Sequence, residues 1–229
     1  MVARVLAALL ASAALLAAPA AAPVCIDPGH GDRANPGTEP IGPGSATRKV
    51  KDGGGARGVA TGQREADLAL DVSLRLRALL RREGIPVVMT RTTTRGLSLG
   101  NVARARTCNR AGAALMLRVH ADGSADRSTH GTHTLHPALR RGWTDDVAAE
   151  SRRAARFLQR ALVRSLGSHD LGLHERGDLT GFNWADVPVV LVELGFLSNP
   201  REDRRLATRA YRARAAAGLR DGVLAFLGR

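Results

Sequence analysis

The chain has 229 residues, of which 44% are hydrophobic, so it can bury one substantial core and is of the size of a single catalytic domain. Its net charge of +13 allows a polyanionic partner. Aromatic residues make up only 3% of the chain, and no base-stacking or groove-reading motif accompanies the charge, so we expect no nucleic-acid partner.

The N-terminal segment differs from the rest of the chain. Arg4 precedes an apolar run over 5–18, and Ala18-Pro19-Ala20 has the small-x-small pattern of a cleavage site. Residues 1–20 are therefore predicted to be a secretory signal peptide, with 21–229 as the mature domain. The alternative is an uncleaved anchor, although a membrane span needs roughly 20 apolar residues. We expect a secreted, periplasmic or cell-wall-associated protein without a stable membrane span after processing.

Export changes the interpretation of the two cysteines. Cys25 lies on the first apolar run, and Cys108 lies in the segment that leads into the run at 113–119. In an oxidising compartment a Cys25–Cys108 disulfide is plausible, and two buried free thiols are the alternative.

Apolar runs alternate with amphipathic segments after the first strand. This alternation predicts an α/β fold, a single domain with a mostly parallel central sheet flanked by helices. A glycine-rich loop without apolar periodicity is expected over 31–62, either as a flap over the site or as an unstructured insertion. We expect strands at 24–27, 85–90, 113–119, 131–135 (at an edge) and 187–192, and helices at 65–82, 99–111, 144–166 and 203–227.

Four polar residues are expected near the carboxyl edge of such a sheet, where active sites of this fold class lie. His30, His120 and Glu193 each follow or end a strand, and Glu65 opens the first long helix. Because the carboxyl ends of parallel strands share one edge, we expect an active site there. Two imidazoles and a carboxylate are the usual protein share of an open zinc site. A further carboxylate can serve as general base and acid, a role for which Glu193 is the candidate.

The spacing of these residues does not by itself separate a metal site from structural histidines, because no helical His-x-x-x-His pair is present. Asp67 and Asp122 are alternative ligands to Glu65, although a capping or loop role suits each better. Asp27 is expected to organise the loop around His30. Solvent-facing roles are expected for the histidines in or beside the strand at 131–135, which are His130, His133 and His136.

Several motifs taken together resemble one enzyme family. These motifs are Asp27-Pro28-Gly29-His30-Gly31, the helix-opening Glu65, Met89-Thr90-Arg91, Val119-His120-Ala121-Asp122, and the segment Val-Glu-Leu-Gly-Phe-Leu-Ser-Asn at 192–199. In this order, from about residue 24 to 227, they resemble the zinc-dependent N-acetylmuramoyl-L-alanine amidases.

The resemblance implies a set of site residues and a reaction. His30, Glu65 and His120 match the ligands of a Zn²⁺ ion, and Glu193 matches the catalytic glutamate. The implied enzyme hydrolyses the amide between the lactyl group of N-acetylmuramic acid and L-alanine, in peptidoglycan or muropeptides. We expect a monomer whose arginines can also contact anionic wall polymers.

One residue departs from the family pattern. Arg118 stands two positions before His120, where a small residue is common, which affects local packing or the approach of substrate. Two other functions are compatible with the same fold. One is a non-catalytic wall-binding or regulatory protein, and the other is a zinc peptidase that cuts within the stem peptide.

Overall fold

The computed structural model describes residues 21–96 and 98–229, so the predicted signal peptide at 1–20 lies outside the described residues. Its centre is a six-stranded sheet with the strand order β4-β1-β5-β8-β6-β7. All neighbouring strands in this sheet are parallel except β6 and β8. The strands are β1 (Val24–Pro28), β4 (Val87–Met89), β5 (Leu115–Asp122), β6 (Thr132–Pro137), β7 (Asp170–Arg176) and β8 (Val189–Phe196).

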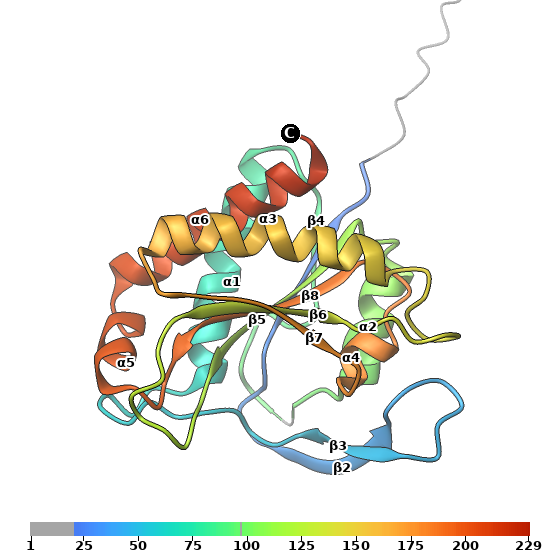
Figure 1. Cartoon of the computed structure of the whole chain (residues 1–229), viewed down its shortest axis with the longest axis horizontal. Helices are drawn as coiled ribbons and strands as arrows, with labels where there is room; N and C mark the ends of the chain where they lie inside the picture. Colours follow the sequence, from blue (N-terminus) through green and yellow to red (C-terminus); the bar gives the residue numbers. More distant parts are fainter. Residues whose placement is uncertain (1–20, 97) are drawn as a thin grey trace, which may run out of the picture.

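Helices cover both faces of the sheet (Figure 1). The helices α1 (Glu65–Arg82), α3 (Ala148–Leu166) and α6 (Arg209–Leu227) pack on one face, where they form the larger core cluster. The helices α2 (Asn101–Arg110) and α4 (Thr180–Asn183) pack on the other face, and α5 (Pro200–Leu206) follows β8. The predicted fold, with a mostly parallel sheet flanked by helices, is confirmed. Within the described part of the chain, no helix is both long and apolar enough to cross a membrane.

The helices show why their sequences fold against the sheet. On α1 the buried side chains of Leu68, Val72, Leu76 and Leu80 recur every four residues and form an apolar stripe. Between α3 and α6 the backbones approach closely, since a Cβ atom at Gly222 would lie 2.8 Å from the Cα atom of Leu158. A side chain larger than hydrogen at this position would therefore push the two helices apart.

The segment at 31–62 contradicts its prediction as a loop without regular structure. It contains a β-hairpin in which β2 (Asn35–Pro40) pairs with β3 (Arg48–Asp52) in antiparallel fashion. The indole N–H groups of both tryptophans tether it, Trp184 to the carbonyl of Pro40 at 2.9 Å and Trp143 to that of Pro43 at 3.0 Å. These hydrogen bonds hold the hairpin in place below the main sheet (Figure 1).

Two further predictions were wrong in detail. β6 lies between β8 and β7 and is therefore an internal strand, whereas the unpredicted β7 forms the edge. The single helix expected at 203–227 is divided into α5 and α6, because Thr208 starts a new helix by accepting a hydrogen bond from the backbone N–H of Tyr211.

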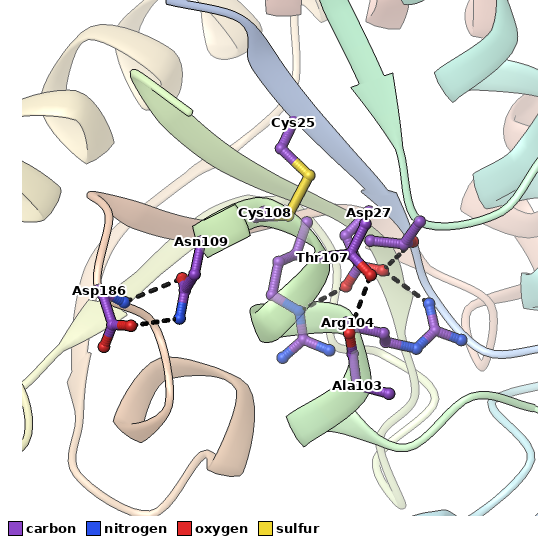
Figure 2. Close-up of a disulfide and its surroundings, with 10 residues drawn as sticks. Cys25, Asp27, Ala103, Arg104, Thr107, Cys108, Asn109 and Asp186 are labelled. Carbon is purple, nitrogen blue, oxygen red and sulfur yellow. Dashed lines mark hydrogen bonds and ion pairs between the residues drawn. A yellow bond between two sulfur atoms is a disulfide. The ribbon is translucent and has the colours of Figure 1, made fainter. Parts of the chain in front are cut away.

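The predicted disulfide is present between β1 and α2. Cys25 and Cys108 are both fully buried, and their Cα atoms are 5.5 Å apart (Figure 2). The bond joins positions 83 residues apart in the chain and fixes α2 against the strand that leads to His30.

We predict that the Cys25→Ala/Cys108→Ala variant has a free energy of unfolding about 4 kcal/mol below that of the wild type, because the bond closes a long loop in the unfolded chain. Equilibrium denaturation with and without dithiothreitol measures this. The reductant should lower the denaturation midpoint of the wild type and leave that of the variant unchanged. Equal stability of both proteins under oxidising conditions would contradict the prediction.

Candidate metal centre

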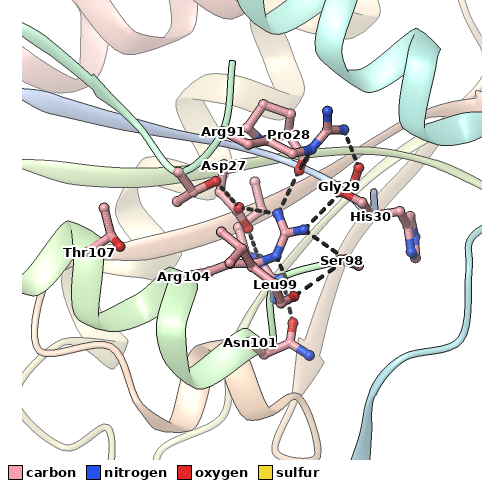
Figure 3. Close-up of polar contacts among 12 residues, drawn as sticks. Asp27, Pro28, Gly29, His30, Arg91, Ser98, Leu99, Asn101, Arg104 and Thr107 are labelled. Carbon is pink, nitrogen blue, oxygen red and sulfur yellow. Dashed lines mark hydrogen bonds and ion pairs between the residues drawn. The ribbon is translucent and has the colours of Figure 1, made fainter. Parts of the chain in front are cut away.

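His30 occupies an unusual backbone conformation just beyond β1. Its φ angle of 58° is left-handed, and it is the one non-glycine residue with a positive φ in the described parts of the chain. This conformation costs roughly 1–2 kcal/mol. Arginine side chains hold the turn: Arg104 donates to the carbonyls of Pro28 at 2.7 Å and His30 at 2.8 Å, and Arg91 donates to that of Gly29 at 2.6 Å (Figure 3).

Three side chains from separate elements meet at this edge of the sheet. Nε2 of His30 lies 3.2 Å from Oε1 of Glu65, and Nδ1 of His120 lies 2.8 Å from the same oxygen. One potential ligand atom from each residue lies within 4.8 Å of the others. The end of β1, the first residue of α1 and the end of β5 thus bring together the three residues predicted as zinc ligands.

Asp52, at the end of β3, supports the first of these residues. Its Oδ1 accepts a hydrogen bond from Nδ1 of His30 at 2.6 Å, which leaves Nε2 directed toward Glu65. Burial lowers the pKa of His30, but the hydrogen bonds with Asp52 and Glu65 outweigh this effect and raise it to about 9. Sequence reasoning missed Asp52. Its one local signal is an acidic residue directly before three glycines, between His30 and Glu65 in the chain.

The surroundings of the three residues fit a zinc ion. Both oxygens of Glu65 accept backbone hydrogen bonds, from Ala56 at 2.8 Å and Ala121 at 3.2 Å, which fixes the carboxylate. A Cβ atom on Gly29 would lie 2.5 Å from the His120 ring, and one on Gly55 would lie 2.8 Å from the His30 ring. Glycine therefore leaves room for both imidazoles, and two nitrogens with one carboxylate oxygen are a donor set that zinc prefers.

Glu193 lies beside this cluster on the neighbouring strand. It is the register partner of His120 on β8, and it is buried. Its Oε2 atom has no hydrogen-bond partner among the described residues. Burial and the nearby carboxylates of Glu65 and Asp122 raise the pKa of Glu193 well above its ordinary value. The side chain is therefore able to hold and release a proton next to the candidate metal site.

Known proteins are similar to this chain in sequence and in fold. The sequence profile of the N-acetylmuramoyl-L-alanine amidase family (Amidase_3) matches residues 24–225. The chain belongs to this family.

Two curated relatives differ in how much of their length the chain spans. The chain is 30% identical over 216 residues to N-acetylmuramoyl-L-alanine amidase Rv3717 of Mycobacterium tuberculosis, which covers 89% of this chain and 86% of that protein. It is 27% identical over 203 residues to the amidase LytC of Bacillus subtilis, which covers 89% of this chain but only 35% of LytC. The chain thus spans about a third of the length of LytC.

Solved structures of the amidase family share the fold. The crystal structure of the N-acetylmuramyl-L-alanine amidase Ami1 from Mycobacterium smegmatis matches with a TM-score of 0.80 at 27% identity, over 90% of this chain and 96% of that chain. Ami1 from Mycobacterium abscessus matches with a TM-score of 0.81 at 25% identity, over 89% of this chain and 97% of that chain.

Other candidate residues lie outside the candidate metal cluster of His30, Glu65 and His120. His133 and His136 are buried, so their expected exposure to solvent is wrong, because β6 is an internal strand. His133 instead stacks on Phe196. Asp67 forms an ion pair with Arg64 at the start of α1 and does not join the cluster.

A cavity of about 210 Å³ opens beside His30 and His120. The hairpin contributes Lys49 and Lys51 to its wall, and β5 contributes Arg118. The hairpin is therefore a wall of the cavity next to the candidate metal cluster, and it also supplies Asp52.

We predict that Asp52→Ala weakens zinc binding by about 10- to 100-fold, as removal of a carboxylate that orients a ligating histidine typically does. Competition against a chromophoric chelator measures the affinity. Asp221→Ala, an equal change of charge on the distant helix α6, should retain the wild-type affinity. If Asp52→Ala binds zinc as tightly as the wild type, Asp52 does not support a metal ligand.

Proposed function

We propose that this chain is a zinc-dependent N-acetylmuramoyl-L-alanine amidase, which hydrolyses the amide between the lactyl group of N-acetylmuramic acid and L-alanine. The observation that carries the proposal is the convergence of His30, Glu65 and His120 beside the buried Glu193. The family match over residues 24–225 supports it, as do the relatives that are named as amidases of this kind.

Each residue has a distinct part in the proposed reaction. His30, Glu65 and His120 would hold the zinc ion, which when bound would polarise the amide carbonyl and lower the pKa of a water molecule toward about 7. Glu193 accepts the proton of the attacking water and then donates it to the departing amine of L-alanine. The raised pKa of Glu193 suits the first step, because it makes the ionised carboxylate a stronger base toward the water molecule.

We also propose that the mature domain begins at residue 21 and acts outside the cytoplasm as a monomer on peptidoglycan or muropeptides. The disulfide between Cys25 and Cys108 supports an oxidising compartment. Peptidoglycan lies outside the cytoplasm, so the location of the proposed substrate agrees with the export that the expected signal peptide would direct.

Digestion of purified muropeptides, followed by mass spectrometry, tests the bond that is cut. An amidase releases an intact stem peptide that begins with L-alanine, together with the free muramoyl sugar. A zinc peptidase would leave L-alanine attached to the sugar, and a wall-binding protein would leave the muropeptides unchanged. Either of the last two results would overturn the proposed function.

We predict that Glu193→Gln retains about one zinc ion per chain but loses about 10²- to 10⁴-fold in turnover, the usual contribution of general acid–base catalysis. Metal analysis and the muropeptide assay measure the two effects separately. Glu175→Gln on the exposed strand β7 is a matched control with wild-type turnover. Undiminished turnover of Glu193→Gln would remove this residue from the mechanism.

A further inference from the structure

Two guanidinium groups share a single buried carboxylate next to the metal centre. Nη1 of Arg104 donates to Oδ1 of Asp27 at 2.7 Å, and Nε of Arg118 donates to Oδ2 at 2.8 Å. All three side chains are buried, and Asp27 has no exposed surface. The group of three carries one net positive charge. A buried charge without a partner is costly, so this arrangement favours an additional anion.

The two arginines differ in how many of their N–H donors have acceptors in the protein. Arg104 also donates to the carbonyls of Pro28, His30 and Leu99 and to the hydroxyl of Ser98, so its role is structural (Figure 3).

Arg118 has one nitrogen atom, Nη1, that donates no hydrogen bond within the described chain. Its Nε donates to Asp27, and its Nη2 donates to Oδ1 of Asn101 at 2.6 Å. Its Nη1 atom donates no hydrogen bond to residues 21–96 and 98–229, where the bonds of Arg118 come from Nε and Nη2. Arg118 lines the cavity beside His120, and a Cβ atom at Gly181 would overlap Nη1, so glycine leaves room for this nitrogen. A ligand in the cavity can therefore supply the missing acceptor.

Arg118 lies at a distance from the candidate metal centre that a short peptide can span. Arg118 and His120 are two residues apart on β5, so their side chains extend from the same face of the strand, from Cα atoms roughly 7 Å apart. Two residues of extended peptide cover the same distance, roughly 7 Å. A peptide with its scissile amide at the metal centre can thus place the residue after L-alanine at Arg118.

The rest of the cavity wall has the same sign of charge. Lys49 and Lys51, the only two lysines of the chain, both line the cavity. Nζ of Lys49 contacts Asp178, whereas Nζ of Lys51 has no polar partner in the described chain. Asp52 is the one acidic residue in the wall, and it is hydrogen-bonded to His30. The wall therefore attracts an anionic group.

We propose that Arg118 determines specificity by binding a free carboxylate on the residue that follows L-alanine in the stem peptide, with Lys51 as an auxiliary cation. This inference rests on the proposed amidase function and names the substrate class within it. A guanidinium suits the task because its planar N–H groups match the geometry of a carboxylate.

The test uses two synthetic muramoyl-L-alanyl substrates, in which the next residue carries either a free α-carboxylate or the corresponding carboxamide. We expect the wild type to favour the carboxylate substrate by about 10- to 100-fold in kcat/KM, as a charge-assisted hydrogen bond predicts. Arg118→Ser should lower this ratio to about 1, and Arg118→Lys should give an intermediate ratio. Asp27 stays paired with Arg104 in both variants.

Two variants on the hairpin complete the design. Lys51→Gln changes a partly exposed side chain and should lower the ratio several-fold, which tests the subsite even if Arg118→Ser does not fold. Arg48→Gln removes one charge from the same strand outside the cavity and should leave the ratio at the wild-type value. Equal ratios in the wild type and Arg118→Ser, or equal losses on both substrates, would overturn the proposal.

Calorimetry separates this inference from the proposed function. The zinc-loaded protein is titrated with L-alanyl-D-glutamate or with its α-carboxamide, which requires no turnover. Tighter binding of the free carboxylate by the wild type than by Arg118→Ser supports the subsite, even if neither muramoyl substrate is cleaved. Equal binding of the two dipeptides by the wild type would overturn the subsite, even if the amidase reaction is observed.

Discussion

The ion pairs of Asp27 connect β1, β5 and α2 at the carboxyl edge of the sheet, next to the candidate site. The pKa of this fully buried carboxyl stays well below its ordinary value, because Arg104 and Arg118 outweigh the effect of burial. Arg104 lies four residues before Cys108 on α2, and Asp27 lies two residues after Cys25 on β1, so an ion pair and a disulfide join the same helix to the same strand (Figure 2). Arg104 then holds the carbonyl of His30, and through this bond the position of α2 determines where the first candidate ligand lies.

The candidate site depends equally on the hairpin that contains β2 and β3. Asp52 reaches His30 from the end of β3, and the two tryptophans of the chain hold the hairpin against the domain. On the other side, Glu39 of β2 accepts the backbone N–H groups of Asn101 and Val102 at the start of α2. The helix that carries Arg104 is thus fixed by the same hairpin that orients His30, so the Asp52 contact and the Asp27 contact belong to one connected structure.

Sequence reasoning located the site through strand order and failed where the deciding contacts were not local. His30, His120 and Glu193 could be predicted to meet, because the carboxyl ends of parallel strands share an edge whatever the strand order is. The hairpin could not be predicted, because both strands are mostly polar and lack apolar periodicity, and β2 also contains glycine and proline. The burial of His133 depends on the position of β6 between two other strands, which no pattern within β6 encodes.

The two glutamates of the candidate site have opposite pKa shifts because their surroundings differ. Glu65 is surrounded by donors, since two backbone N–H groups and both imidazoles contact its carboxylate, and these hydrogen bonds keep its pKa well below the ordinary value despite burial. Glu193 is equally buried, but its neighbours include two carboxylates, and its pKa is raised. A carboxylate that stays ionised suits a metal ligand, and one with a raised pKa binds a proton more readily and suits proton transfer, so the opposite shifts favour Glu65 as the proposed ligand and Glu193 as the proposed catalyst. Because His120 and Glu193 are register partners on adjacent strands, the fold places a proposed ligand and the proposed catalyst side by side.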